Sequence, residues 1–108
     1  MLKIELYNPE LDKVETFTEN FVSARSLRKV IEFGMRQEKE EMNELQQLDE
    51  LIALIAGLFR DERVNFDSIL DGIESSKIAD VLSKILEEVM GGEVKKKEKQ
   101  EYLNKVTE

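Results

Sequence analysis

Apolar and polar residues alternate at the start of the chain, which is the pattern of a β-strand with one buried face. The residues on the apolar side are Leu2, Ile4 and Leu6. A turn around Pro9 follows, and residues 14–18 are rich in β-branched side chains that favour a second strand. These segments predict a hairpin, in which Val14 and Phe17 share one face only if the second strand contains a bulge.

Farther along, apolar residues recur every three or four positions, which predicts helices that each bury one face. Ser23 is expected to cap the first helix and Asp67 the third. Ser75 or Ser76 is expected to cap the fourth helix, and Gly91–Gly92 to end it. The expected buried stripes are Leu27, Val30, Ile31, Gly34 and Met35 in the first helix; Leu45, Leu48, Leu51, Ile52, Ile55 and Phe59 in the second; Ile69, Leu70 and Ile73 in the third; and Ile78, Val81, Leu82, Ile85, Leu86 and Val89 in the fourth.

These elements predict a mainly α protein with a short N-terminal β-hairpin, an α+β fold built as a small bundle of about four helices. The chain has 108 residues and no internal repeat, so we expect one compact helical domain with its hairpin over residues 1–92. Residues 93–108 contain five lysines and four glutamates but few apolar residues. They predict a charged tail, either flexible or a helix that orders on a partner. The polar stretch 37–44 is either a solvated helix extension or a linker.

The composition argues against catalysis. The chain contains no histidine and no cysteine, which removes the usual acid–base group near neutral pH and every thiolate ligand. Asp67, Asp71 and Glu74 could gather around a hard metal ion, but they lack the spacing of a calcium loop, and helix capping and solubility account for them more simply. We therefore predict no catalytic residue, no cofactor and no metal site.

The charge balance narrows the choice of partner. The formal net charge is −8, which repels phosphate backbones and argues against nucleic acid. The longest apolar stretch, residues 51–59, is far below the ~20 residues that cross a bilayer, so no membrane span is expected. An acidic residue at position 5 is too early for a secretory signal, which favours a cytoplasmic location.

The remaining candidates are side chains that could bind another protein. Four apolar residues at the junctions between elements could be exposed anchors, or could simply close the core: Phe21, Val22, Phe59 and Phe66. Arg25, Arg28 and Arg36 lie on the polar side of the first helix, where they could dock an acidic partner. The alternative is that these arginines pair with the acidic residues of segment 38–50.

The segment Phe21-Val22-Ser23-Ala24-Arg25-Ser26-Leu27-Arg28-Lys29, together with the opening strands, resembles the tail assembly chaperones of long-tailed (siphovirus-type) bacteriophages and prophages. The resemblance spans residues 1–92, and it rests on the order of short hydrophobic motifs. The later motifs are Leu48-Asp49-Glu50-Leu51, Leu58-Phe59, Phe66, Leu70-Asp71-Gly72-Ile73 and Val89-Met90-Gly91-Gly92.

The resemblance implies a function that composition does not show. Such chaperones coat the long, helical tape measure protein, keep its apolar stripes soluble, help recruit tail tube protein in the host cytoplasm, and are absent from the mature virion. Many copies arrayed on one partner would gain from multivalency. A homo-oligomer formed through the same apolar surface is a further hypothesis. The alternative function is an acidic helical regulatory adaptor or inhibitor that binds a basic cellular protein.

Overall fold

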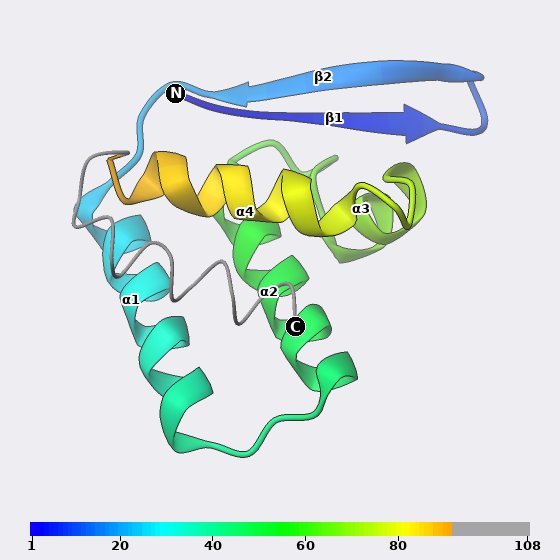
Figure 1. The fold of residues 1–108 in the computed structure, drawn as a ribbon. Coiled ribbons are helices and arrows are strands. Elements are labelled where there is room, and N and C mark those ends of the chain that lie inside the picture. Colours follow the sequence, from blue (N-terminus) through cyan, green and yellow to red (C-terminus); the bar gives the residue numbers. More distant parts are fainter. Residues whose placement is uncertain (92–108) are drawn as a thin grey trace.

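A computed structural model describes residues 1–91, and the expected charged tail over residues 93–108 lies outside the described residues. A two-stranded sheet lies over a layer of helices (Figure 1), which confirms the predicted α+β fold with an N-terminal hairpin. The elements are β1 (Leu2–Asn8), β2 (Lys13–Glu19), α1 (Ala24–Lys39), α2 (Glu44–Leu58), α3 (Phe66–Gly72) and α4 (Ile78–Val89).

The two strands pair one to one, antiparallel, from the Leu2–Glu19 pair to the Asn8–Lys13 pair. No bulge interrupts this register, so Val14 and Phe17 lie on opposite faces of the sheet. Phe17 is buried with the inner side of β1, whereas Val14 is exposed on the outer face. The side chains of the second strand therefore alternate between the inner and outer faces of the sheet, although its sequence does not alternate clearly between apolar and polar residues.

Side-chain hydrogen bonds close the turn of the hairpin. The Oδ1 atom of Asn8 accepts hydrogen bonds from the backbone N–H groups of Glu10 at 3.0 Å and Leu11 at 3.4 Å. Asp12 has a φ of 49°, a left-handed conformation that aspartate tolerates better than most residues. Its carboxylate accepts a hydrogen bond from the Tyr7 hydroxyl at 2.7 Å, and this bond raises the pKa of Tyr7.

The core lies between the inner face of the hairpin and the helices. Gly72, at the end of α3, sits so close to β1 that a Cβ atom there would lie 3.1 Å from both the Leu6 Cβ and the Tyr7 carbonyl oxygen. The absence of a side chain thus lets α3 approach the sheet backbone. The most deeply buried large side chains are Leu2, Ile4, Val30, Ile52, Ile55, Ile69 and Leu82.

The helix starts agree with the predicted caps at one position and differ at two. Ser23 caps α1 as predicted, because its Oγ atom accepts from the Ser26 N–H at 3.1 Å. The predicted Asp67 cap is wrong, since Asn65 starts α3 two residues earlier by accepting from the Ser68 N–H at 2.9 Å. A side-chain cap by Ser75 or Ser76 is also wrong, because α4 begins after Lys77 with no side-chain cap bond. At the other end of α4, Gly91 adopts a φ of 81°, which fits the predicted glycine stop.

Candidate partner-binding surface

Helix α1 leaves an apolar line of side chains uncovered. Leu27 is 37% exposed, Ile31 is 41% exposed and Met35 is 50% exposed. The prediction that these three residues belong to the core is therefore wrong. It is wrong also for Leu45 on α2, which is 67% exposed, and for Leu70 on α3, which is 46% exposed. The three residues of α1 are spaced at i, i+4 and i+8 on the helix, so they lie along one side of it and form a continuous ridge. We call these three residues the α1 stripe.

The buried side of α1 is a different and narrower strip. Val30, Phe33 and Gly34 are its buried residues. This strip packs against α2 and α4, and α1 stands at the edge of the helical layer in Figure 1. At about 100° per residue, the α1 stripe lies beside the buried strip and extends the apolar arc beyond what α2 and α4 cover. Helix α1 thus carries more apolar surface than the other elements described over residues 1–91 cover.

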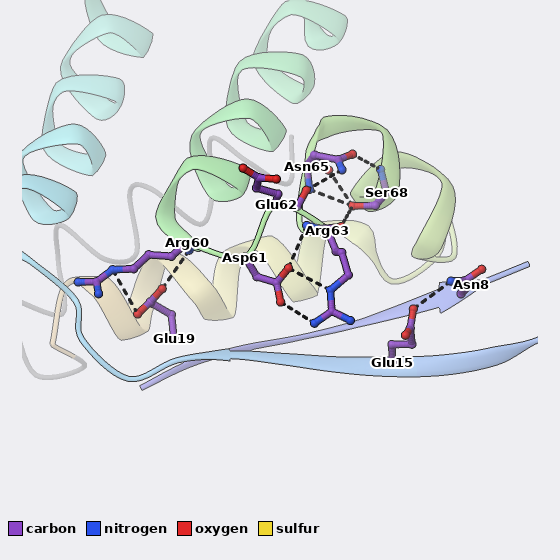
Figure 2. A network of polar contacts seen from close by, with 9 residues as sticks. All are labelled: Asn8, Glu15, Glu19, Arg60, Asp61, Glu62, Arg63, Asn65 and Ser68. Carbon is purple, nitrogen blue, oxygen red and sulfur yellow. Dashed lines mark hydrogen bonds and ion pairs between the residues drawn. The ribbon is translucent and has the colours of Figure 1, made fainter. Parts of the chain in front are cut away.

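The predicted anchor Phe21 is also exposed. It lies in the connection between β2 and α1, and 64% of its surface is accessible. The guanidinium carbon of Arg60 lies 5.9 Å from the centre of its ring, within the range of a cation–π contact. Glu19 holds Arg60 in place, because its carboxylate accepts the Arg60 backbone N–H at 3.0 Å and forms an ion pair with the side chain at 3.9 Å (Figure 2).

The other three apolar candidates lie in or against the core. Phe59 is buried, and Val22 and Phe66 are half-buried and packed against the core. The structure therefore does not bring these three side chains together with Phe21 on an open surface. The exposed apolar residues are instead those of the α1 stripe, which the sequence pattern predicted to lie in the core. The available signal was the arc of apolar residues in α1, which becomes too wide for one packed face once Phe33 is included.

The arginines of α1 divide between exposed positions and an ion-pair network. Arg36 binds Glu40 at 3.3 Å and Glu50 at 2.7 Å, as the pairing alternative predicted, and these bonds raise the pKa of Arg36. Arg28 instead binds Glu32, on its own helix, at 3.0 Å. Arg25 is exposed and makes no ion pair within residues 1–91. Arg25 is therefore the arginine of α1 that remains without an ion pair within residues 1–91.

The charge of α1 is opposite in sign to that of the other helices. Helix α1 contains five basic and two acidic residues, whereas α2 and α3 contain only acidic ones among their charged residues. Helix α4 has three acidic residues and one lysine. Among the helices described over residues 1–91, the exposed apolar stripe thus runs along the basic one.

A polar network fixes the loop between α2 and α3 against the hairpin (Figure 2). The Arg63 side chain binds Asp61 at 2.8 Å and lies 4.9 Å from the centre of the Phe17 ring. The hydrogen bond from Arg63 lowers the pKa of Asp61 to about 2, and the same bond raises the pKa of Arg63. This loop carries Arg60, so the network also fixes the residue that contacts Phe21.

The described part of the chain shows neither a metal-binding cluster nor a membrane-spanning helix. Within residues 1–91, no group of three or more acidic, histidine or cysteine side chains is placed to hold a metal ion. None of the helices described over the same residues combines the length and the apolar character needed to cross a bilayer.

Comparison with known proteins assigns the chain to a family. A family model described as phage tail chaperone protein matches residues 1–106, nearly the whole chain. No curated protein and no solved structure is found to match. The family match confirms the resemblance inferred from the ordered hydrophobic motifs, and a tail chaperone has an assembly role that is not enzymatic. The chain therefore belongs to the phage tail chaperone family.

Proposed function

We propose that this phage tail chaperone binds the tape measure protein through the α1 stripe, keeps that protein soluble in the host cytoplasm, and helps to recruit tail tube protein before leaving the finished virion. The observation that carries the proposal is the exposed line of Leu27, Ile31 and Met35 on a basic helix. Family membership supports the assembly role.

The physical basis is the packing of one amphipathic helix on another. An apolar ridge on α1 would pack into the apolar stripe of a long helical partner and withdraw both from water. Burial of a fully exposed isoleucine contributes about 1.5–3 kcal/mol, and Ile31, which is 41% exposed, would contribute the smaller part of that. Each contact would be modest, and many copies on one long partner would add their affinities.

The charge distribution supports the same arrangement. With α1 turned toward its partner, the acidic helices α2, α3 and α4 remain on the outside of the coated complex. Coated complexes would then repel one another, which keeps them apart until tube subunits arrive. Self-association of the free chain through the α1 stripe is part of the proposal, because the same apolar ridge is uncovered when no partner is present.

The test is co-expression with the tape measure protein of the same phage genome. Ile31→Asp places a charge in the middle of the α1 stripe and is expected to reduce the soluble tape measure protein at least tenfold. Leu70→Asp is the matched control, because Leu70 is a similarly exposed apolar residue, 46% accessible, on α3. The control should keep the tape measure protein as soluble as the wild type does.

The opposite pattern would contradict the proposal. If Ile31→Asp still solubilised the tape measure protein while Leu70→Asp did not, the binding surface would lie on the acidic side of the molecule. Binding of a basic cellular protein, weakened by salt and unaffected by Ile31→Asp, would instead support the alternative of an acidic adaptor.

A further inference from the structure

Within residues 1–91, no strand lies beside the outer edge of β1. The sheet formed by these residues has two strands, in which β1 pairs with β2. In an antiparallel pair, alternate residues direct both their N–H and C=O groups toward the partner strand, and the residues between them direct both groups away from it. One set of β1 residues therefore presents its backbone groups at the open edge.

The position of Gly72 identifies which residues these are. A Cβ atom on Gly72 would lie 3.1 Å from the Tyr7 carbonyl oxygen and 3.3 Å from the Tyr7 nitrogen. Both backbone groups of Tyr7 thus face α3 rather than β2. By the alternation of the ladder, Glu5 and Lys3 direct their N–H and C=O groups to the same edge. No backbone hydrogen bond described for residues 1–91 joins this edge to a helix or loop.

A groove runs along this edge. It has a volume of about 610 Å³ and lies between β1 and α4, with the end of α3 at one side. Figure 1 shows α4 running beneath the hairpin along the direction of β1. Lys3, Glu5 and Tyr7 line the groove on the strand side. On the helix side the apolar lining residues are Ile73, Val81 and Ile85.

The groove also carries balanced charge at its rim. Lys77, Lys84, Glu74 and Glu88 line it on the helix side, with two charges of each sign. Lys77 and Glu74 form an ion pair at 3.8 Å, and Glu88 lies 3.9 Å from the amino group of Met1. Lys3 and Glu5 add one charge of each sign on the strand side, so the groove has no strong excess of either sign. What it presents to a ligand is the backbone edge of β1 and an apolar wall.

We propose that this groove binds an extended segment of a second protein, which joins β1 as a third strand. Lys3 and Glu5 present donor and acceptor pairs about 6.6 Å apart, two residues of strand, which is the repeat of another extended backbone. A helix cannot supply those partners, because its backbone groups are already bonded internally. Since alternate side chains of the added strand would face α4, the segment carries apolar residues at every second position.

This groove is separate from the α1 stripe, and it adds a second binding surface to the proposed function. The α1 stripe suits an amphipathic helix, whereas the β1 edge suits an extended chain. A chaperone that holds a helical partner while recruiting another protein needs two such surfaces. The inference rests on the proposed function only in the choice of candidate partners for the test.

The test compares two proline variants on the same rung of the hairpin. Glu5 pairs with Thr16, both side chains are exposed, and the backbone groups of both residues point away from the other strand. Glu5→Pro removes a donor from the groove edge, and Thr16→Pro removes the equivalent donor from the outer edge of β2. Both prolines lie at edge positions where the lost N–H makes no ladder bond. Val81→Trp is a third variant, which fills the groove from α4 without altering β1.

The probe is a set of overlapping 12-residue peptides that tile the tail proteins encoded beside this chain, measured by fluorescence anisotropy. At least one peptide with alternating apolar residues is expected to bind the wild type and Thr16→Pro equally, and to bind Glu5→Pro and Val81→Trp at least tenfold more weakly. Hydrogen exchange should show the amides of Lys3 and Glu5 unprotected in the free chain and protected in the complex.

Several results would overturn the inference. These are the absence of any binding peptide, equal binding by Glu5→Pro and Val81→Trp, or protection that appears on α1 in place of β1. Protection of the Lys3 and Glu5 amides that rises with protein concentration alone would assign the edge to a second copy of the chain. Because Ile31→Asp leaves the β1 edge intact, peptide binding by that variant separates a failure of this inference from a failure of the proposed function.

Discussion

Helices α1 and α4 have similar sequence patterns but different surroundings. Both carry apolar residues at helical spacing, and the apolar side of α4 is covered, with Leu82, Ile85 and Leu86 all buried. The main contacts of α4 within residues 1–91 are with β1, α2 and α1, whereas those of α1 are with α2 and α4. An apolar stripe therefore shows that a helix has a surface to be covered. It does not show whether the same chain or another one covers it.

The largest loss of stability is expected from truncating a side chain that α4 contributes to the core. Leu82 is 0% exposed, so Leu82→Ala removes buried methyl groups and leaves a cavity. The free energy of unfolding should fall by about 2–5 kcal/mol. Urea denaturation followed by circular dichroism measures the change. A loss below about 1 kcal/mol would mean that α4 is not the helix on which the core depends.

Much of the fold could be predicted from the sequence because strand and helix periodicities differ. The alternation at Leu2, Ile4 and Leu6 predicted β1, and the helical spacing predicted all four helices. Helix starts were less predictable, because several polar residues near a start compete to cap it. Asn65 starts α3 in place of Asp67 because its side chain and that of Ser68 exchange hydrogen bonds with each other's backbone, at 2.9 Å in both directions.

The candidate surface was harder to predict than the fold. Leu27, Ile31 and Met35 have the spacing of a core stripe, and the three-dimensional arrangement leaves them between 37% and 50% exposed. Phe21, a candidate anchor for which closing the core was the favoured alternative, is exposed, whereas Phe59 is buried. Residues of one type at similar junctions thus have opposite environments. Periodicity reports the direction of a side chain along its own helix but carries no information on where other helices pack.

A moderate effect on stability is expected at the starts of α1 and α4, because of these two helices only α1 has a side-chain cap. Ser23→Ala removes the acceptor for the Ser26 N–H and should lower the free energy of unfolding by about 1 kcal/mol. Lys77→Ala is the matched change at the start of α4, where no side-chain cap bond exists, and it should be close to neutral. Thermal unfolding of both variants measures the difference. Equal losses would contradict the assignment of the cap.

The smallest effect on stability is expected from Ile31→Ala. This variant also distinguishes α1 from α4 most clearly, because it should change binding but not folding. Ile31 is 41% exposed, so truncation removes little buried surface, and alanine is a better helix former than isoleucine. The free energy of unfolding should change by less than about 0.5 kcal/mol, against the several kcal/mol expected for Leu82→Ala. Affinity for the tape measure protein should nevertheless fall, because the proposed function has that partner covering Ile31. Measuring unfolding and binding on the same sample distinguishes an apolar side chain that stabilises the fold from one that binds a partner.

A large loss of stability would place Ile31 in the core after all, and an unchanged affinity would remove α1 from the binding surface.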